Sequence, residues 1–148
     1  MSDVQIRNAE AQDEASWRAL WSQYLAFYEV DLAPDVTDAT WARILDPESR
    51  LAARLAVLGG VVVGFAVWHR HVASWSLKDD CYLEDLFVDP AARSASIGRA
   101  LIDDLVEVAR AGGCGRVYWH TNEGNSRARA LYDSYARADG HIRYRLRL

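Results

Sequence analysis

The chain has 148 residues, 51% of them hydrophobic, and a formal net charge of -4. This length and composition fit one domain over residues 1–148 with a single sizeable core. Acidic and basic residues are mixed along the chain without long runs of one sign, which argues against nucleic acid or an anionic membrane as partner and favours a cationic small molecule.

The sequence also indicates where the protein is located and whether its cysteines form disulfides or bind a metal. No apolar stretch is long enough to span a bilayer and no signal segment opens the chain, so we expect a soluble, cytoplasmic protein. Cys81 and Cys114 lie far apart and outside any CxxC or Cys/His pattern. This spacing predicts two free thiols and no metal site.

The first half of the chain shows no repeat and no linker. Alternation predicts a strand in VQIRNA, and aromatic residues at helical spacing predict a helix over 12–29. We expect a second helix in TDATWARIL, capped by Thr37 or Asp38. RLAARLAVL and VVVGFAVWHRHV predict an antiparallel hairpin around Gly59 and Gly60.

The second half alternates strands with helices. CYLEDLFV predicts a strand, SIGRALIDDLVEVARAGG a helix, RVYWHTN a strand, SRARALYDSYARA a helix and HIRYRLRL the last strand. A hairpin-built half joined to a βαβ-like half predicts an α/β (α+β) fold, with a mixed sheet that carries helices on its faces.

The stretch FVDPAARSASIGRALIDDL, residues 87–105, lies where a strand passes through a loop into a helix. The start of a helix leaves backbone N–H groups unpaired and attracts anions. Gly98 lies in the first turn, where the missing side chain would let a phosphate approach the backbone. Arg93 and Arg99 add positive charge. On these residues alone, a connector without a ligand is the more ordinary interpretation.

Three segments together resemble the GNAT family of N-acetyltransferases. RSASIG resembles the family's pyrophosphate loop, with Ser96 where its first glycine is usual. YLEDLFVDP resembles the strand before that loop, and WHTNEGNSRARALY resembles a later family segment. Within the family, diamine and polyamine acetyltransferases are most similar, because their first helix ends in a pair like Tyr28-Glu29. The resemblance implies a mostly antiparallel sheet, splayed in the middle beside YLEDLFV and flanked by about four helices.

The resemblance also implies acetyl-coenzyme A (acetyl-CoA) as co-substrate, without a metal. The backbone of Leu86, Phe87 and Val88 would pair with the pantetheine arm, and main-chain N–H groups of the loop would hold the pyrophosphate. Serine and alanine carry the same N–H group as glycine, but Ser96 reaches positive φ only at an energetic cost. The further residues implied in cofactor binding are Arg93, Ser94, Ala95, Ile97, Gly98, Arg99, Asn125, Ser126 and Ala128.

Two residues are the expected catalysts. The resemblance assigns Tyr132 as the acid that protonates the departing thiolate, since a phenol with a pKa of about 10 is protonated at neutral pH. An ammonium must lose a proton before it attacks, and Glu84 is our first choice of base. On a regular strand Glu84 shares a face with Leu86 and Val88, whereas Asp85 points the other way.

A cationic amine is expected to contact Tyr28, Glu29, Glu84 and Asp85. Asp79 and Asp80 are candidates for an acidic rim, although a charged turn is the more ordinary interpretation. Trp17 and Trp21 are expected in the core. The expected substrates are diamines, polyamine-like molecules or amino-acid-derived amines, acetylated by direct attack in a ternary complex.

Alternatives to this function stay open. The acceptor can instead be a protein lysine or an aminoglycoside, because both are amines. Ser96 in an altered loop favours a noncatalytic CoA-binding regulatory module. The resemblance further implies a homodimer, in which HIRYRLRL pairs or exchanges between subunits.

Overall fold

A computed structural model describes residues 3–148, apart from the side chains of Ser94 and Ala95. In chain order its elements are β1 (Val4–Asn8), a 3-10 helix η1 (Ala11–Asp13), α1 (Glu14–Phe27), α2 (Pro34–Leu45), β2 (Ala52–Leu58), β3 (Val61–His71), β4 (Asp80–Val88), a 3-10 helix η2 (Pro90–Ala95), α3 (Ile97–Ala111), β5 (Arg116–Trp119) and α4 (Ser126–Tyr132). The predicted order of elements is confirmed as far as α4.

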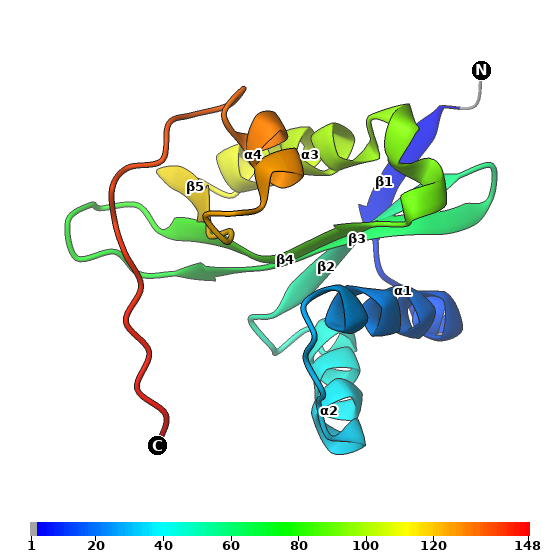
Figure 1. Cartoon of the computed structure of the whole chain (residues 1–148). Coiled ribbons are helices and arrows are strands. Elements are labelled where there is room, and N and C mark those ends of the chain that lie inside the picture. The colour runs from blue at the N-terminus through cyan, green and yellow to red at the C-terminus, as the bar shows by residue number, and fades with distance from the viewer. Residues whose placement is uncertain (1–2) are drawn as a thin grey trace.

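A five-stranded sheet with the order β1-β2-β3-β4-β5 forms the centre of the fold. The strands β1 to β4 pair antiparallel, whereas β5 runs parallel to β4. α1 and α2 cover one face of the sheet, and α3 and α4 cover the other (Figure 1). The expected mixed, mostly antiparallel sheet between helices is therefore confirmed.

Aromatic side chains fill the layer between the sheet and α1 and α2. Trp17 stacks on Trp21 with 5.0 Å between ring centroids, and on Trp41 of α2 with 5.2 Å. Phe65 of β3 and Phe87 of β4 belong to the same cluster. Stacked rings bury a large apolar area and fix the helices against each other. The expectation that Trp17 and Trp21 are core residues is confirmed.

The opposite layer is mainly aliphatic. α3 is amphipathic and buries one stripe of side chains, namely Ile97, Leu101, Ile102, Leu105 and Ala109. These side chains pack on β-strand residues such as Cys81, Leu83 and Val88. Cys81 and Cys114 are free thiols, as predicted.

Two irregularities of β4 position the candidate site. Val67 of β3 pairs with Asp85 and Trp68 pairs with Leu83, so Glu84 is the extra residue of a β-bulge. β5 pairs with β4 only from Asp80 to Leu83. Among the described residues, the rest of β4 has no strand beside it on that side. This is the splay that the family resemblance implied.

Two helix boundaries differ clearly from the sequence predictions. α2 begins at Pro34 instead of after Thr37 or Asp38, because the fixed φ of proline suits the first helical position. α4 ends at Tyr132, several residues earlier than predicted.

No helix between residues 3 and 148 combines the length and apolar character needed to cross a membrane.

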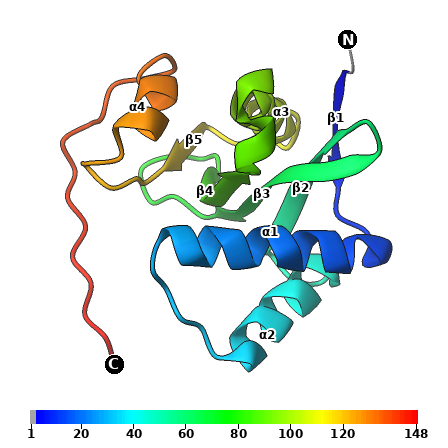
Figure 2. The ribbon, with the colours of Figure 1, turned by 45° about the vertical axis from the view of Figure 1, so that its right-hand side comes forward.

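The predicted last strand, HIRYRLRL, is wrong as an element of this sheet. Residues 141–148 have no strand partner among the described residues. The segment leaves α4 and runs along the outside of the molecule in two views (Figures 1 and 2). Alternation marks a segment that can form a strand, but a strand also needs a partner for its backbone hydrogen bonds.

Candidate active site

The bulge in β4 turns two neighbouring carboxylates toward one face. Glu84 and Asp85 line the same cavity, whereas Leu86 and Val88 pack into the aliphatic layer under α3. The expectation that Glu84 shares a face with Leu86 and Val88, with Asp85 pointing away, is therefore wrong. It assumed regular alternation, and the extra residue of the bulge breaks that alternation.

The cavity lies between α1, α2 and the sheet and has a volume of about 350 Å³. Its wall combines both carboxylates with one arginine and a few apolar side chains. The lining residues are Trp21, Thr40, Arg43, Leu51, Val67, His69, Glu84 and Asp85. This size and mixture of apolar and polar groups are typical of a small-molecule site.

Asp85 is the more buried of the two carboxylates. Burial raises the pKa of Asp85 to about 6, a hydrogen bond from Tyr24 lowers it, and the charge of Glu84 raises it further. The hydroxyl of Tyr24 donates to Oδ1 of Asp85 at 2.7 Å. Burial also raises the pKa of Tyr24, with Asp85 as a further cause, so this phenol remains a donor.

Glu84 is the exposed member of the pair. Its Oε2 lies 3.5 Å from Nε2 of His69 on β3. His69 in turn packs edge-on against Tyr82. Glu84 therefore joins the cavity to a patch of histidine and tyrosine side chains on the sheet surface.

This patch contains three histidines, His69, His71 and His120. His71 Nε2 lies 2.6 Å from the hydroxyl of Tyr118, and the hydroxyl of Tyr82 lies 3.1 Å from Nδ1 of His120. Over the described part of the chain, no three His, Cys, Asp or Glu side chains are grouped to hold a metal ion.

Tyr28 and Glu29, the expected amine contacts after α1, do not line this cavity. Burial raises the pKa of Tyr28, and a hydrogen bond with Asn125 lowers it, so Tyr28 lies beside the start of α4. Glu29 is exposed and has a positive φ of 54°. The structure brings Glu84 and Asp85 together and leaves Glu29 outside this group. Tyr28 does not line the cavity but lies next to it, because its ring packs on that of Tyr24 at 5.1 Å and the charge of Asp85 also raises the pKa of Tyr28.

Leu86, Phe87 and Val88 form the open part of β4. The side chains of Phe87 and Val88 are buried, on opposite faces of the sheet. The carbonyl of Val88 accepts a hydrogen bond from Nε of Arg93 at 3.1 Å, and the Arg93 guanidinium lies over the Phe87 ring. The side chains thus anchor the strand, while its edge facing β5 can pair with an extended ligand.

The loop after β4 is formed by η2 and ends at Ser96. Ser96 has φ 58° and ψ 32°, so it adopts the left-handed conformation that a serine reaches only at an energetic cost. The side chains of Ser94 and Ala95, two of the expected cofactor contacts, lie outside the described residues. Ser96 makes no side-chain capping bond to α3, and the first N–H groups of a helix lack intrahelical partners. This helix start can therefore hold an anion.

Gly98 and Arg99 face α4. A Cβ added to Gly98 would lie 3.3 Å from Cδ2 of Leu131. Arg99 donates to Oγ of Ser134 at 3.0 Å. The small size of Gly98 therefore serves the packing of α3 on α4, where the sequence suggested clearance for a phosphate. Ile97 points into the core, so only its backbone is available to a ligand.

α4 places Asn125 and Tyr132 at its two ends. Oδ1 of Asn125 accepts from the Ala128 N–H at 3.4 Å, so Asn125 is the N-cap. Tyr132 packs against Trp119, and burial raises the pKa of Tyr132 to about 12, with Tyr28 as a further cause. Tyr28, Asn125 and Tyr132 therefore lie close together, while Ser126 is exposed at the helix start.

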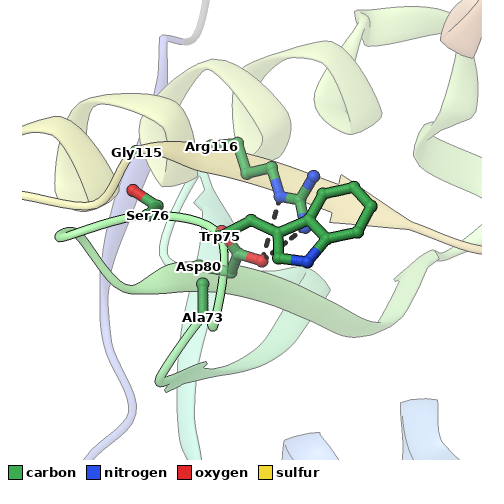
Figure 3. A pocket seen from close by; sticks show the side chains of 6 residues that line it. All are labelled: Ala73, Trp75, Ser76, Asp80, Gly115 and Arg116. Atoms are coloured by element: carbon green, nitrogen blue, oxygen red, sulfur yellow. Dashed lines mark hydrogen bonds and ion pairs between the residues drawn. The ribbon is translucent and has the colours of Figure 1, made fainter.

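A second, smaller cavity of about 120 Å³ lies at the other end of β4. Arg116 pairs there with the buried carboxylate of Asp80 at 2.9 Å, beside the exposed ring of Trp75 (Figure 3). Asp79 pairs with Arg70. The two aspartates thus belong to a charged turn and do not line the larger cavity.

Sequence reasoning missed Tyr24, Arg43 and His69 as parts of the site. Tyr24 lies one helical turn before Tyr28, so the aromatic spacing of α1 could have indicated it. Arg43 reaches the cavity only through the packing of α2, and no motif marks it.

Comparisons with known proteins point in the same direction as this geometry. The acetyltransferase (GNAT) family model matches residues 14–136. The chain is 33% identical over 144 residues to the D-amino-acid N-acetyltransferase HPA3 of Saccharomyces cerevisiae, which covers 96% of this chain and 89% of that protein. A shorter match to the thialysine N-epsilon-acetyltransferase of Bos taurus has 32% identity over 81 residues, 55% of this chain and 47% of that protein.

Solved structures share the fold. The aminoglycoside N-acetyltransferase AAC(6')-Iy in complex with CoA superimposes with a TM-score of 0.83 at 24% identity, covering 100% of this chain and 97% of that chain. Ribosomal-protein-alanine N-acetyltransferase from Brucella melitensis superimposes with a TM-score of 0.83 at 21% identity, and the match covers 99% of this chain and 100% of that chain. Acetyl-CoA is the typical co-substrate of such proteins. From the family match and the relative aligned along most of its length, the chain belongs to the GNAT family of N-acetyltransferases.

Proposed function

We propose that the protein acetylates a primary amine of a small molecule, by direct attack on acetyl-CoA in a ternary complex. The observation that carries this proposal is the double use of β4, whose end has an open edge and whose bulge faces a carboxylate-lined cavity. Two substrates would therefore meet at one strand. A C–N bond forms as the C–S bond breaks, the nitrogen loses a proton, and the sulfur gains one.

Acetyl-CoA would supply an activated acetyl thioester. Supporting groups are the open backbone of Leu86, Phe87 and Val88 and the N–H groups at the start of α3. An N–H near Phe87 or Val88 would also stabilise the developing oxyanion. The full set proposed for this co-substrate adds Arg93, Ser94, Ala95, Ser96, Ile97, Gly98, Arg99, Asn125, Ser126 and Ala128.

Glu84 is the proposed general base, directly or through water. An ammonium in the cavity would face both carboxylates, and Asp85 is held in place by Tyr24. Glu84 is exposed and lies beside His69, which gives the abstracted proton a route to solvent. Asp85 therefore contacts the ammonium while Glu84 removes the proton.

Tyr132 is the proposed donor to the departing thiolate. With a pKa of about 12, its phenol stays protonated throughout the neutral range. A thiol has a pKa of about 8.5, so complete proton transfer from this phenol is uphill. A hydrogen bond that stabilises the thiolate is the larger part of its role.

The acceptor is a small diamine-like, polyamine-like or amino-acid-derived molecule. Supporting this size are the cavity of about 350 Å³ and two relatives named for D-amino acids and thialysine. A protein lysine or an aminoglycoside would carry most of its atoms outside such a cavity.

Release of free thiol from acetyl-CoA tests the proposal. The protein is mixed with diamines, polyamines, amino acids, aminoglycosides and histone peptides in turn. We expect release with small amines. If acetyl-CoA binds by calorimetry but no amine releases thiol, the chain is instead a noncatalytic CoA-binding module.

We also propose a homodimer that uses the C-terminal segment. Ile142, Tyr144, Leu146 and Leu148 alternate with arginines and are 76–116% exposed. β5 pairs only with β4, so its other edge is open within the described residues. A second copy of the segment at that edge would bury these side chains. Light scattering that gives a monomer mass would reject this arrangement.

A further inference from the structure

The larger cavity carries opposite charges on facing walls. Glu84 and Asp85 lie on the sheet side, in the bulge of β4. Arg43 and Thr40 lie on α2, one helical turn apart, and form part of the opposite wall. A ligand that crosses the cavity therefore meets anionic groups at one end and a guanidinium at the other.

Arg43 is exposed, and its guanidinium forms no hydrogen bond or ion pair with any residue from 3 to 148. Its neighbour in the same helical layer behaves differently, because Arg18 binds Glu14 and Asp38, each at 2.9 Å. Arg54 likewise pairs with Asp104 at 2.8 Å. Arg43 thus keeps its planar set of donors available at a cavity wall, where a carboxylate is the best geometric match.

We propose that the acceptor is a free amino acid, whose carboxylate binds Arg43 and whose ammonium faces Glu84 and Asp85. This inference rests on the proposed function and names its substrate class. The carboxylate and ammonium of one small molecule satisfy both walls. The complementary pairing also orients the amine toward β4, where the open strand edge begins.

Other amines satisfy this cavity less well. A diamine that spans it brings a second cation toward Arg43, and like charges repel. A monoamine with an apolar tail offers the guanidinium no carboxylate to bind and so gains nothing from Arg43. Specificity then follows from a charge that binds the right acceptor and disfavours the others.

Arg43 also lies in the last turn of α2, where a cation stabilises the helix end. A lysine would serve that structural role equally, but it cannot form the two parallel hydrogen bonds of an arginine to a carboxylate. Arg43→Lys and Arg43→Ala therefore separate the two roles. Arg50→Ala is the matched control, because Arg50 is an exposed arginine outside the cavity.

The experiment compares each amino acid with the amine left after loss of its carboxylate. Suitable pairs are D- or L-phenylalanine with 2-phenylethylamine, and D- or L-lysine with pentane-1,5-diamine. The readout is the ratio of kcat/KM for amino acid and amine in each variant, so that differences in intrinsic nucleophilicity cancel.

We expect the wild type to favour at least one amino acid over its amine. Arg43→Ala should lower that ratio about 10- to 100-fold, mainly through a higher KM for the amino acid, as loss of a charge-assisted pair predicts. The ratio for Arg43→Lys should lie between the ratios for the wild type and for Arg43→Ala. The ratio for Arg50→Ala should match that of the wild type. An unchanged ratio in Arg43→Ala, with acetylation intact, overturns the inference alone. If neither amino acids nor amines release thiol from the wild type, the proposed function fails as well.

Discussion

The two sides of β4 are built in different ways. The proposed acceptor cavity depends on side chains from four separate elements, such as Trp21 of α1, Arg43 of α2, His69 of β3 and Asp85 of β4. The proposed cofactor side depends mainly on the backbone of one continuous stretch from the end of β4 to the start of α3. A backbone site is expected to tolerate a change of side chain such as Ser96, whereas a site made of side chains is not.

The largest expected effect lies on the acceptor side. Glu84→Gln removes the proposed base while keeping the size of the side chain. We expect kcat to fall by about 10²- to 10⁴-fold, the range typical of general base catalysis. Steady-state thiol release measures this. Glu29→Gln is the matched control, because Glu29 is an exposed carboxylate outside the cavity.

An unchanged kcat in Glu84→Gln would move the proton transfer to Asp85. The pH profile then distinguishes the two carboxylates. With Asp85 as base, the acid limb of kcat/KM falls near pH 6, where its pKa of about 6 places it, and it disappears in Asp85→Asn.

A substitution of Tyr132 tests whether a side chain on the proposed cofactor side affects kcat as strongly as Glu84 does. Tyr132→Phe should lower kcat about 10- to 100-fold, less than the loss of the base, because a thiolate already leaves without full protonation near neutral pH. The KM for acetyl-CoA should stay within a factor of about two. Tyr144→Phe is the control, since Tyr144 is exposed in the C-terminal segment and lines neither cavity. Equal rates for Tyr132→Phe and wild type would remove Tyr132 from the donor role.

The same difference between backbone and side chains explains what the sequence could predict. Hydrophobic period and local motifs identified the strands β1 to β5, α1 and α3, because each depends on neighbouring residues. The bulge at Glu84 depends on the register between β3 and β4, which no local pattern reveals. The position of Arg43 at the cavity depends on the packing of α2. The last strand failed because alternation does not specify a partner strand.

A stability measurement sharpens the picture of the buried carboxylate. Asp85 has a folded pKa of about 6 against an ordinary value of 3.8. Between these pH values the folded state binds more protons than the unfolded state, so the free energy of unfolding contributed by Asp85 falls as pH rises and stays low above pH 6. The difference of about 2 pKa units corresponds to at most about 3 kcal/mol.

Asp85→Asn should remove this penalty while keeping an oxygen that accepts from Tyr24. We compare the free energy of unfolding of the variant with that of the wild type at each pH. The advantage of the variant should be larger at pH 7.5 than at pH 4, by about 1 to 3 kcal/mol. Urea denaturation at both pH values measures the difference. Asp13, whose pKa is lowered by its bond to Arg7, affects both proteins alike and cancels. A difference that does not change with pH would mean that Asp85 ionises as it does in the unfolded chain.

The smallest expected effect comes from restoring the missing loop glycine. Ser96 holds a left-handed conformation that disfavours any side chain by about 1 to 2 kcal/mol, and the greater freedom of glycine in the unfolded chain offsets roughly 0.5 to 1 kcal/mol of this. Ser96→Gly should therefore raise the free energy of unfolding by about 1 kcal/mol or less. Its effect on acetyl-CoA affinity should be below about threefold, because the N–H donors are unchanged.

Glu29→Gly supplies the control, since Glu29 shares the positive φ but is exposed after α1, away from the loop. Both variants should gain a similar free energy of unfolding. Their affinities for acetyl-CoA, measured by calorimetry, should differ only slightly. A loss of affinity above about tenfold in Ser96→Gly alone would show that the serine hydroxyl binds the co-substrate. The cofactor side would then depend on a specific side chain, as the acceptor side does, and the contrast between the two sides of β4 would not hold.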